Sequence, residues 1–327
     1  MKAVLIKEPG DAEQLFIGKY LTPKPADNEL LVKVKATALN RADILQRKGF
    51  YPPPKGASPI LGLEMAGIVE QVGSLCPGWN VGDRVFGILP GGGYAEYVTL
   101  PDAMAMPIPG NFSFEDAAAI AEVYLTAYQT LVWIGQLQPD NFVLIHAGAS
   151  GVGTAAIQLV KEIGATSIVT AGTEAKCNTC LELGASLAIN YKERPFAQPV
   201  QEFTGNKGVH IVLDFVGASY WDQNLSVLAT DGRWVLIATL GGAKVEHVNL
   251  GLLLKKRIQF TATTLRARGL DYKIQLTRDF TDFALPRFAD GRLKPVIDRV
   301  FSWEGVIDAH RYMEANKNSG KIILNGM

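Results

Sequence analysis

The chain has 327 residues, and its 32 basic residues (Lys+Arg) are balanced by 32 acidic residues (Asp+Glu). A net charge of zero gives no electrostatic footprint for nucleic acid or a membrane surface, so a small-molecule partner is favoured. The length exceeds that of a typical single core and predicts two domains. The apolar run in MKAVLIKEPG is too short for a signal-peptide core, no segment has the length of a membrane-spanning helix, and three cysteines do not suggest a disulfide framework. We therefore expect a cytoplasmic protein.

The first 120 residues contain many short strand-like runs separated by Gly and Pro. The runs are KAVLIK, LLVKVKATAL, EMAGIVEQVG, DRVFGIL and YAEYVTL. This pattern predicts a β-rich domain. The segment PPPKGASPILG is predicted to be a loop within that domain, because strand-like sequence resumes directly after it.

The run NFVLIHAGASGVG leads from an apolar strand into a glycine-rich turn, and the helix-like TAAIQLVKEIG follows. This order seats a dinucleotide pyrophosphate at a helix N-terminus. We expect Gly148 to take the backbone angles of the tight turn, Gly151 to let the main chain approach the phosphates, and Gly153 to let the helix pack on the strand. Ser150 stands where a second glycine is usual. The expected pyrophosphate-binding residues are Gly148, Ser150, Gly151, Val152 and Gly153.

Short runs rich in Val and Ile continue after this helix, mostly separated by segments long enough for helices. They are residues 167–172, 187–190, 210–215, 233–240 and 258–264. Such alternation predicts an α/β fold with a doubly wound parallel sheet. The alternative is a generic α/β domain whose glycines serve only a turn.

The end of the second strand of this sheet indicates the cofactor. An NAD enzyme usually carries Asp or Glu there, whereas this chain has Gly172 and Thr173, with Lys176 one helical turn later. A hydroxyl and a cation suit a 2′-phosphate, so NADPH is predicted. Glu174 is the contrary signal and is interpreted as a carboxylate favoured at a helix N-terminus. The alternative for Lys176 is an ordinary solvated helix lysine.

Cys177 and Cys180 form a CxxC in the helix that follows the second strand. A zinc site would need a second CxxC or a His pair, and a redox motif would open its helix directly after a strand. We interpret the two residues as surface or semi-buried thiols of a helix.

From Asp271 the pattern changes once more. It predicts a helix around residues 272–289, the strand PVIDRVFS, a helix over 303–316 and a last strand KIIL. These elements suit a return of the chain to the β-rich domain.

Six segments carry a resemblance to a known family: LNRADILQRKG, PILGLEMAGIVEQVG, VGDRVFGILPGGGYAEYV, AAAIAEVYLTAYQ, HAGASGVGTAAIQL and EANKNSGKIIL. Together they resemble the zinc-independent quinone oxidoreductases, a branch of the medium-chain dehydrogenases/reductases that includes zeta-crystallin. The resemblance implies a GroES-like catalytic domain over residues 1–122 and 266–327. It implies a Rossmann NADPH-binding domain over residues 123–265.

The same superfamily contains zinc alcohol dehydrogenases, so the positions of their metal ligands are informative. Where those enzymes carry a zinc cysteine this chain has Asn40, and where they have Gly-His-Glu it has Gly62, Leu63 and Glu64. The third ligand position falls near Glu122, and no four-cysteine lobe appears between residues 89 and 106. Asn40 and Leu63 supply no zinc ligand, so no metal is expected. A quinone accepts hydride without a Lewis acid, which favours quinones or polarised enones.

The resemblance also implies the remaining site residues. Asn40 and Tyr51 are the expected catalytic residues, because an amide and a phenol can orient a substrate oxygen or relay a proton. Asp43 and Thr126 are expected at the cofactor, although an ion pair between Asp43 and Arg41 that holds the loop is the alternative. Further expected cofactor contacts are Tyr191, Ser219, Gly241, Gly242, Thr263, Thr264 and Leu265. For all of these except Tyr191, the alternative is an ordinary turn residue at the end of a strand.

We therefore expect an NADPH-dependent quinone oxidoreductase. The alternatives are a zinc-free enoyl or enone reductase of the same superfamily, and a cofactor-binding protein with incidental activity. The apolar strand at residues 258–264 is expected at the edge of the sheet, where it would pair with a second copy in a homodimer unless a loop or helix covers it.

Overall fold

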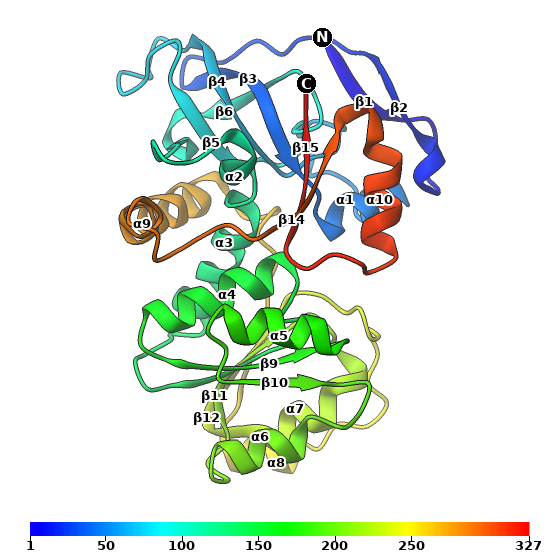
Figure 1. The fold of residues 1–327 in the computed structure, drawn as a ribbon, viewed down its shortest axis with the longest axis vertical. Helices are drawn as coiled ribbons and strands as arrows, with labels where there is room; N and C mark the ends of the chain where they lie inside the picture. The colour runs from blue at the N-terminus through cyan, green and yellow to red at the C-terminus, as the bar shows by residue number, and fades with distance from the viewer. Residues whose placement is uncertain (327) are drawn as a thin grey trace. The chain divides into compact units, whose positions relative to one another are not determined.

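The computed structural model describes residues 1–326, which form two compact units. The first unit comprises residues 1–125 and the segment that begins at Leu265, and the second comprises Thr126–Thr264. The boundaries expected from the sequence lie after residues 122 and 265. Figure 1 shows β-rich first-unit elements in blue, cyan and red, and an alternating α/β second unit in green and yellow.

The first unit is built on a seven-stranded, mostly antiparallel sheet whose longest strand is β3 (Glu29–Ala38). Val32, Val34 and Ala36 alternate along β3 and are fully buried, as expected for a strand that packs one face on a core. The other strands are β14 (Ile297–Ser302), β15 (Lys321–Asn325), β4 (Glu64–Val72), β5 (Arg84–Ile88), β6 (Tyr97–Pro101) and β7 (Met106–Pro107).

The C-terminal segment completes this sheet. β15 pairs antiparallel with β3, so that Ile323 lies opposite Ala38, and β14 adds in parallel beyond it. The red strand β15 therefore lies beside the blue strand β3 in Figure 1. The predicted return of the C-terminus to the β-rich fold is confirmed by this pairing.

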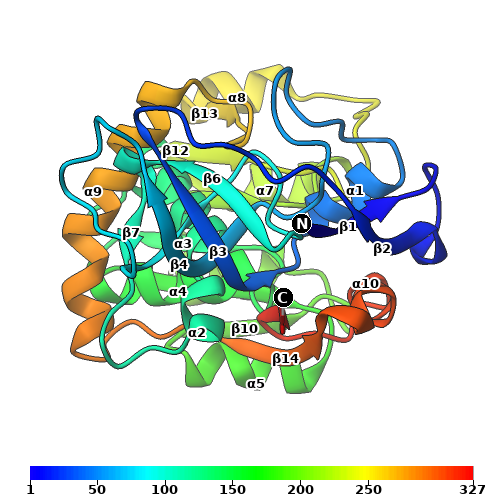
Figure 2. The ribbon, with the colours of Figure 1, turned by 90° about the horizontal axis from the view of Figure 1, so that it is seen from above.

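A hairpin and several helices surround the sheet of the first unit. In Figure 2, α9 is the long orange helix and α10 the red one. The hairpin strands are β1 (Lys2–Ile6) and β2 (Leu15–Lys19), and the helices are η1 (Ala12–Gln14), α1 (Arg41–Arg47), η2 (Asp102–Met104), α2 (Phe114–Ala118), α9 (Leu270–Ala289), η5 (Trp303–Gly305) and α10 (Val306–Glu314). α3 (Ala121–Tyr128) begins in this unit and ends in the second.

The second unit contains a six-stranded parallel sheet in the order β10-β9-β8-β11-β12-β13. This is the order of a doubly wound dinucleotide-binding sheet, so the predicted fold class is confirmed. The strands are β8 (Phe142–Ile145), β9 (Thr166–Ala171), β10 (Leu187–Asn190), β11 (Val209–Asp214), β12 (Leu228–Leu236) and β13 (Gln259–Ala262).

Helices cover both faces of the parallel sheet. α4 and α5 lie on one face, and α6, α7 and α8 lie toward the other (Figure 1). The helical elements are η3 (Gln129–Ile134), α4 (Gly151–Glu162), α5 (Glu174–Glu182), α6 (Ala197–Phe203), η4 (Ala218–Tyr220), α7 (Trp221–Val227) and α8 (Leu250–Lys256). Trp234 of β12 is fully buried in the core that these layers enclose.

One predicted strand is displaced toward the N-terminus. The run Arg233–Leu240 was predicted to be extended throughout, whereas β12 covers Leu228–Leu236. The next residues turn back, and the N–H of Gly241 donates to the carbonyl oxygen of Val216 at 2.8 Å. Within residues 1–326, no helix is both long enough and apolar enough to cross a lipid bilayer.

Candidate functional site

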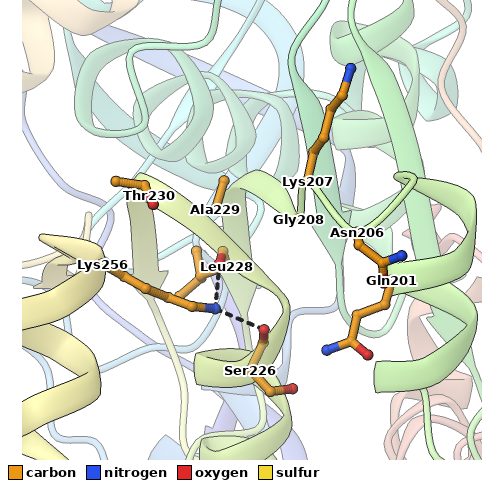
Figure 3. A pocket seen from close by; sticks show the side chains of 9 residues that line it. All are labelled: Gln201, Asn206, Lys207, Gly208, Ser226, Leu228, Ala229, Thr230 and Lys256. Atoms are coloured by element: carbon orange, nitrogen blue, oxygen red, sulfur yellow. Dashed lines mark hydrogen bonds between the residues drawn. The ribbon is translucent and has the colours of Figure 1, made fainter.

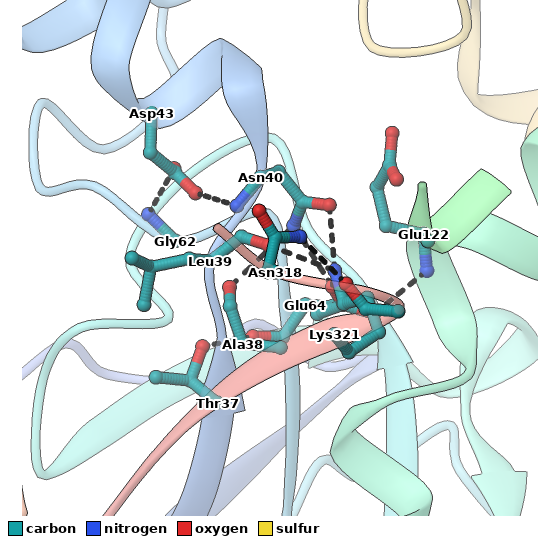
Figure 4. Close-up of polar contacts among 12 residues, drawn as sticks. Thr37, Ala38, Leu39, Asn40, Asp43, Gly62, Glu64, Glu122, Asn318 and Lys321 are labelled. Atoms are coloured by element: carbon teal, nitrogen blue, oxygen red, sulfur yellow. Dashed lines mark hydrogen bonds and ion pairs between the residues drawn. The ribbon is translucent and has the colours of Figure 1, made fainter. Parts of the chain in front are cut away.

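Three side chains of the first unit form a fully connected buried cluster, which we call the ion-pair cluster: Asn40, Glu64 and Lys321 (Figure 4). The ammonium of Lys321 donates to Glu64 Oε1 and Asn40 Oδ1, both at 2.7 Å, and to the carbonyl oxygen of Leu39 at 2.9 Å. The amide nitrogen of Asn40 donates to Glu64 Oε1 at 2.8 Å. The main-chain N–H of Glu122 donates to Glu64 Oε2 at 2.9 Å.

Strand pairing brings this cluster together. Asn40 is the N-cap residue of α1 just after β3, Glu64 is the first residue of β4, and Lys321 is the first residue of β15. β3 lies between β4 and β15 in the sheet, so the three residues meet around the end of β3.

The cluster leaves few hydrogen-bonding groups unused. An ammonium has three N–H donors, and Lys321 uses all of them. Both oxygens of Glu64 accept hydrogen bonds, and both ends of the Asn40 amide are engaged within the first unit. Asn40, at the position of a zinc cysteine, and Glu64, beside the position of a zinc histidine, are therefore engaged with Lys321. Among residues 1–326, no group of three or more His, Cys, Asp and Glu side chains is arranged to hold a metal ion.

Asp43 is fixed by main-chain donors. The N–H groups of Asn40 and Gly62 donate to its two carboxylate oxygens at 2.8 and 3.0 Å, and the Tyr94 hydroxyl lies 3.4 Å from Oδ2. Burial raises the pKa of Asp43 to about 6, although the two main-chain hydrogen bonds oppose the shift. Arg41 donates to Asn316 at 2.7 Å, so the ion pair between Arg41 and Asp43 that the sequence suggested is wrong.

Tyr51 follows α1, directly before the loop PPPKGASPILG that the sequence predicted, and it is half-buried. The guanidinium of Arg266 lies 5.3 Å from the centre of its ring. Arg266 also donates to the carbonyl oxygen of Pro90 at 2.8 Å and to Gln46 Oε1 at 2.7 Å. The second expected catalytic side chain is thus accompanied by a buried cation.

In the second unit, the glycine-rich turn has the form that a dinucleotide site requires. Ser150 is the N-cap of α4, and its hydroxyl accepts from the N–H of Gly153 at 3.1 Å. A Cβ at Gly153 would lie 2.4 Å from the carbonyl oxygen of Ala147, so only glycine fits there. Gly151 and Val152 are the first residues of α4, whose N-terminal N–H groups suit an anion.

One glycine of this turn has a different role from the one predicted. The residue with left-handed backbone angles is Ala147, with φ of 49°, and Gly148 is not in that region. A Cβ at Gly148 would instead lie 2.7 Å from Cβ of Val169 in β9. Gly148 is therefore required because the turn packs tightly on the neighbouring strand.

Four of the expected cofactor residues gather at the ends of β9 and β10: Gly172, Thr173, Lys176 and Tyr191. Thr173 is the N-cap of α5, and its hydroxyl accepts from the N–H of Lys176 at 3.3 Å. A Cβ at Gly172 would lie 2.8 Å from the Tyr191 hydroxyl oxygen. Glu174 is the first residue of α5, as predicted. A cation, a hydroxyl and a phenol at this point fit a 2′-phosphate better than a ribose diol.

Cys177 and Cys180 lie on the same helix, and both are buried rather than at the surface. Burial raises the pKa of Cys177 and raises that of Cys180 to about 12. The prediction of helix thiols is confirmed, but their expected exposure is wrong. Thiols with raised pKa values are poor nucleophiles, so we interpret both as packing residues.

Main-chain hydrogen bonds join the segments that follow β11 and β12. The N–H of Ala218 donates to Gly242 at 2.9 Å and that of Ser219 donates to Gly241 at 3.3 Å. Asp214, at the end of β11, accepts from the N–H groups of Val216 and Gly217 at 2.7 and 3.1 Å. The structure therefore brings Ser219, Gly241 and Gly242 together at the carboxyl edge of the sheet, the edge at which doubly wound folds bind ligands.

The remaining expected residues are divided between the units. Thr263 and Thr264 follow β13, and the N–H of Thr263 donates to Leu236 at 3.0 Å. Thr126 lies in α3 in the second unit, whereas Leu265 belongs to the first. The first unit also holds Asn40, Asp43 and Tyr51.

His146 is a packed residue. It is fully buried at the end of β8, where it lies 2.9 Å from the Thr170 hydroxyl and 2.7 Å from Asn224 Oδ1. Burial lowers the pKa of His146, which favours the neutral ring.

A polar pocket lies in the second unit at the beginnings of β11 and β12 (Figure 3). This edge of the parallel sheet is opposite to the carboxyl edge that holds Ser219, Gly241 and Gly242. Lys256 lies along the pocket and donates to the carbonyl oxygens of Leu225, Ser226 and Leu228 at 3.0, 2.8 and 2.6 Å. These bonds satisfy the carbonyls at the end of α7. We interpret Lys256 as a structural residue.

Sequence reasoning assigned no role to two residues that the structure places at the expected catalytic side chains, Lys321 and Arg266. Lys321 was noticed only as part of the final motif EANKNSGKIIL. It is 257 residues from Glu64 in the chain, and Arg266 is 220 residues from Gln46. No local pattern marks such contacts.

Comparisons with known proteins agree with this architecture. Residues 26–110 match the family of alcohol dehydrogenase GroES-like domains, and residues 151–281 match the zinc-binding dehydrogenase family. Quinone oxidoreductase 1 of Escherichia coli (strain K12) is 39% identical over 319 residues, which cover 96% of each chain. A phenolphthiocerol/phthiocerol polyketide synthase protein of Mycobacterium tuberculosis is 33% identical over 324 residues, 98% of this chain, but the chain spans only 14% of that protein's length.

Among solved structures, the Escherichia coli quinone oxidoreductase complexed with NADPH superposes with a TM-score of 0.89 at 32% identity, covering 100% of both chains. Both units and their order along the chain are shared with these oxidoreductases. The chain belongs to the quinone oxidoreductase branch of the medium-chain dehydrogenase/reductase superfamily.

Proposed function

We propose that the protein is an NADPH-dependent quinone oxidoreductase that works without zinc. The observation that carries the choice of cofactor is the end of β9, where Thr173 and Lys176 stand in place of a ribose-binding carboxylate. The NADPH complex of the Escherichia coli quinone oxidoreductase supports the same cofactor.

The residues of the second unit would hold NADPH through its phosphates. The N-terminal N–H groups of α4, with Ser150 as N-cap, receive the pyrophosphate. Lys176 and Thr173 receive the 2′-phosphate, and Tyr191 lines the same pocket. When bound, NADPH supplies a hydride.

The residues of the first unit would orient the acceptor. Tyr51 offers a phenol to an acceptor oxygen, and Asn40 is held in one orientation by Lys321 and Glu64. A quinone is electron-poor enough to accept hydride without a Lewis acid. The ion-pair cluster engages Glu64 and Asn40 internally, which supports a reaction that does not use zinc.

Stopped-flow oxidation of protein-bound NADPH by a set of ortho- and para-quinones tests this proposal. We expect rapid single-turnover oxidation that survives a chelator, and no stoichiometric zinc on metal analysis. Loss of activity on chelation, restored by zinc, would refute the zinc-free proposal.

The same assay with enoyl thioesters and simple enones separates the alternatives. Faster oxidation by an enoyl thioester than by any quinone would identify an enoyl reductase. Absence of turnover with every acceptor, together with tight NADPH binding, would identify a cofactor-binding protein.

We place the protein in the cytoplasm as a homodimer. Cell fractionation tests the location, and light scattering tests the assembly.

A further inference from the structure

Arg266 is a buried cation with an incomplete set of partners. Its side chain is 7% exposed, and Nη1 has no hydrogen-bond partner within residues 1–326. Nε donates to the carbonyl oxygen of Pro90 and Nη2 to the amide oxygen of Gln46, which are both neutral acceptors. The guanidinium is therefore buried without a carboxylate in ion-pair contact in the part of the chain that the structure describes.

Such an arrangement is unfavourable for stability alone. A buried charge is normally paired, because neutral hydrogen bonds only partly offset the loss of its hydration. Burial accordingly lowers the pKa of Arg266, and Tyr51 and Asp43 oppose this shift. Asp43 is itself saturated by main-chain donors. The guanidinium of Arg266 also faces the ring of Tyr51 and makes no hydrogen bond to it. Its central carbon lies 5.3 Å from the centre of the ring.

We propose that Arg266 is a positioning residue for Tyr51: it holds the phenol in place and stabilises the phenolate that remains when Tyr51 has given its proton to an acceptor oxygen. The proposal rests on the proposed function and names the acceptor class, a carbonyl compound whose oxygen becomes negatively charged as hydride arrives.

In the proposed step, the acceptor gains a hydride and a proton. Hydride brings an electron pair to the acceptor, and the π electrons of the conjugated system move onto a carbonyl oxygen. The O–H bond of Tyr51 breaks as a new O–H bond forms on that oxygen, which gives a hydroquinone from a quinone. The phenolate then takes a proton from water. The charge that moves to Tyr51 is the charge that Arg266 is placed to stabilise.

The electrostatics around Tyr51 support this role. Burial raises the pKa of the phenol, and Glu122 raises it further, whereas Arg266 lowers it. Removal of the guanidinium should therefore raise the pKa of the Tyr51 phenol, because burial and the Glu122 carboxylate, which both oppose ionisation, would remain.

Arg266 also joins parts of the main chain. It contacts Pro90 directly, and Gln46, to which it donates, itself donates to the carbonyl oxygen of Pro59 at 2.9 Å. A purely structural clamp is thus the competing explanation. Two substitutions separate the two roles: Arg266→Lys keeps the charge, and Arg266→Gln keeps polarity without charge.

The first test is an alkaline titration of phenolate absorbance, which requires neither NADPH nor quinone. The chain has 10 tyrosines, so the signal of Tyr51 is obtained as the difference between each protein and the same protein with Tyr51→Phe. We expect Arg266→Gln to move the Tyr51 titration to higher pH, and Arg266→Lys to move it less. The matched control is Arg268→Gln, which removes an exposed guanidinium 4.8 Å from the Tyr272 ring and should leave the titration unchanged.

The second test is kinetic. We expect Tyr51→Phe to lower kcat for a quinone by about 10²-fold, in the range of a lost general acid. Arg266→Gln should lower it by roughly tenfold to a hundredfold, Arg266→Lys by less, and the double variant by no more than the worse single variant. The Kd for NADPH should not change.

An unaltered Tyr51 titration in a folded Arg266→Gln protein would overturn the proposal. Equal kcat losses in the Lys and Gln variants would also overturn it, because a clamp does not depend on charge. A protein that reduces no quinone would instead refute the proposed function, while the titration would still decide whether Arg266 stabilises the phenolate.

Discussion

Replacement of Lys321 by Met should expose how strongly the ion-pair cluster stabilises the first unit. Lys321 and Glu64 are 3% and 0% exposed, and their charged atoms lie 2.7 Å apart. Lys321→Met removes the ammonium and leaves the Glu64 carboxylate buried, with only the amide of Asn40 and the N–H of Glu122 as donors.

The free energy of unfolding should fall strongly in Lys321→Met, because the variant leaves a buried carboxylate without its cation. Removal of one partner of a buried pair typically costs about 3–5 kcal/mol. A unit of this size loses about 2–4 °C in Tm per kcal/mol, so the transition of the first unit should fall by roughly 6–20 °C. The double variant Glu64→Leu with Lys321→Met has no unpaired charge, and it should recover most of this loss.

Differential scanning calorimetry of the two single variants and the double variant measures these differences. The control is Lys33→Met, which breaks a surface pair with Glu70 at 4.0 Å in which the side chains are 40% and 42% exposed. That change should cost less than about 1 kcal/mol. A Tm loss for Lys321→Met no larger than that of the control would refute the reasoning, and so would a double variant less stable than both single variants.

Three further predictions concern the cofactor, pH and assembly. Lys176→Ala should weaken NADPH binding by about 1.5–3 kcal/mol, because a charge-assisted contact to the phosphate is lost. Fluorescence titrations should show nearly unchanged NADH binding. Equal affinity of the unmutated protein for both cofactors would contradict this. Because the folded-state pKa of Asp43 is raised to about 6, the folded chain retains a proton that the unfolded chain loses at lower pH, so stability should fall as pH rises from about 4 to 6. Asp43→Asn should flatten that part of the Tm profile, and an identical slope in both proteins would count against it. β13 is an edge strand, and its Phe260 is 42% exposed. The double substitution Gln259→Lys with Thr261→Lys should therefore weaken a homodimer, as measured by light scattering. An unmutated protein that is monomeric at micromolar concentration would exclude the dimer.

Features with a local cause were predicted well. The period of apolar residues and the positions of glycine predicted the strands and helices of the second unit, because side-chain alternation and turn geometry depend on neighbours in the sequence. The N-cap roles of Ser150 and Thr173 were not predicted, although they also depend on residues close in the sequence. The errors in this region are small: the left-handed residue is Ala147 rather than Gly148, and β12 ends at Leu236.

The candidate site in the first unit depended much less on local pattern. Asn40 was predicted from its motif, but the direction of its amide is decided by Lys321 and Glu64, which come from two other strands. An ion pair with Arg41, two residues earlier in the sequence, was the alternative to a cofactor contact for Asp43. Its partners are instead main-chain N–H groups and Tyr94, because the carboxylate is directed into the fold.

The sequence by itself determined the two kinds of domain, the order of elements, the glycine-rich turn and the residues at the end of β9, since each rests on contacts between residues close in the chain. The tertiary structure alone decided which charges are buried and what they face. Lys321 meets Glu64 across 257 residues, and Arg266 lies against Tyr51, because strand pairing and loop packing bring these segments together. An isolated lysine or arginine in the sequence carries no sign of such a partner, since desolvation and pairing exist only after the chain has folded.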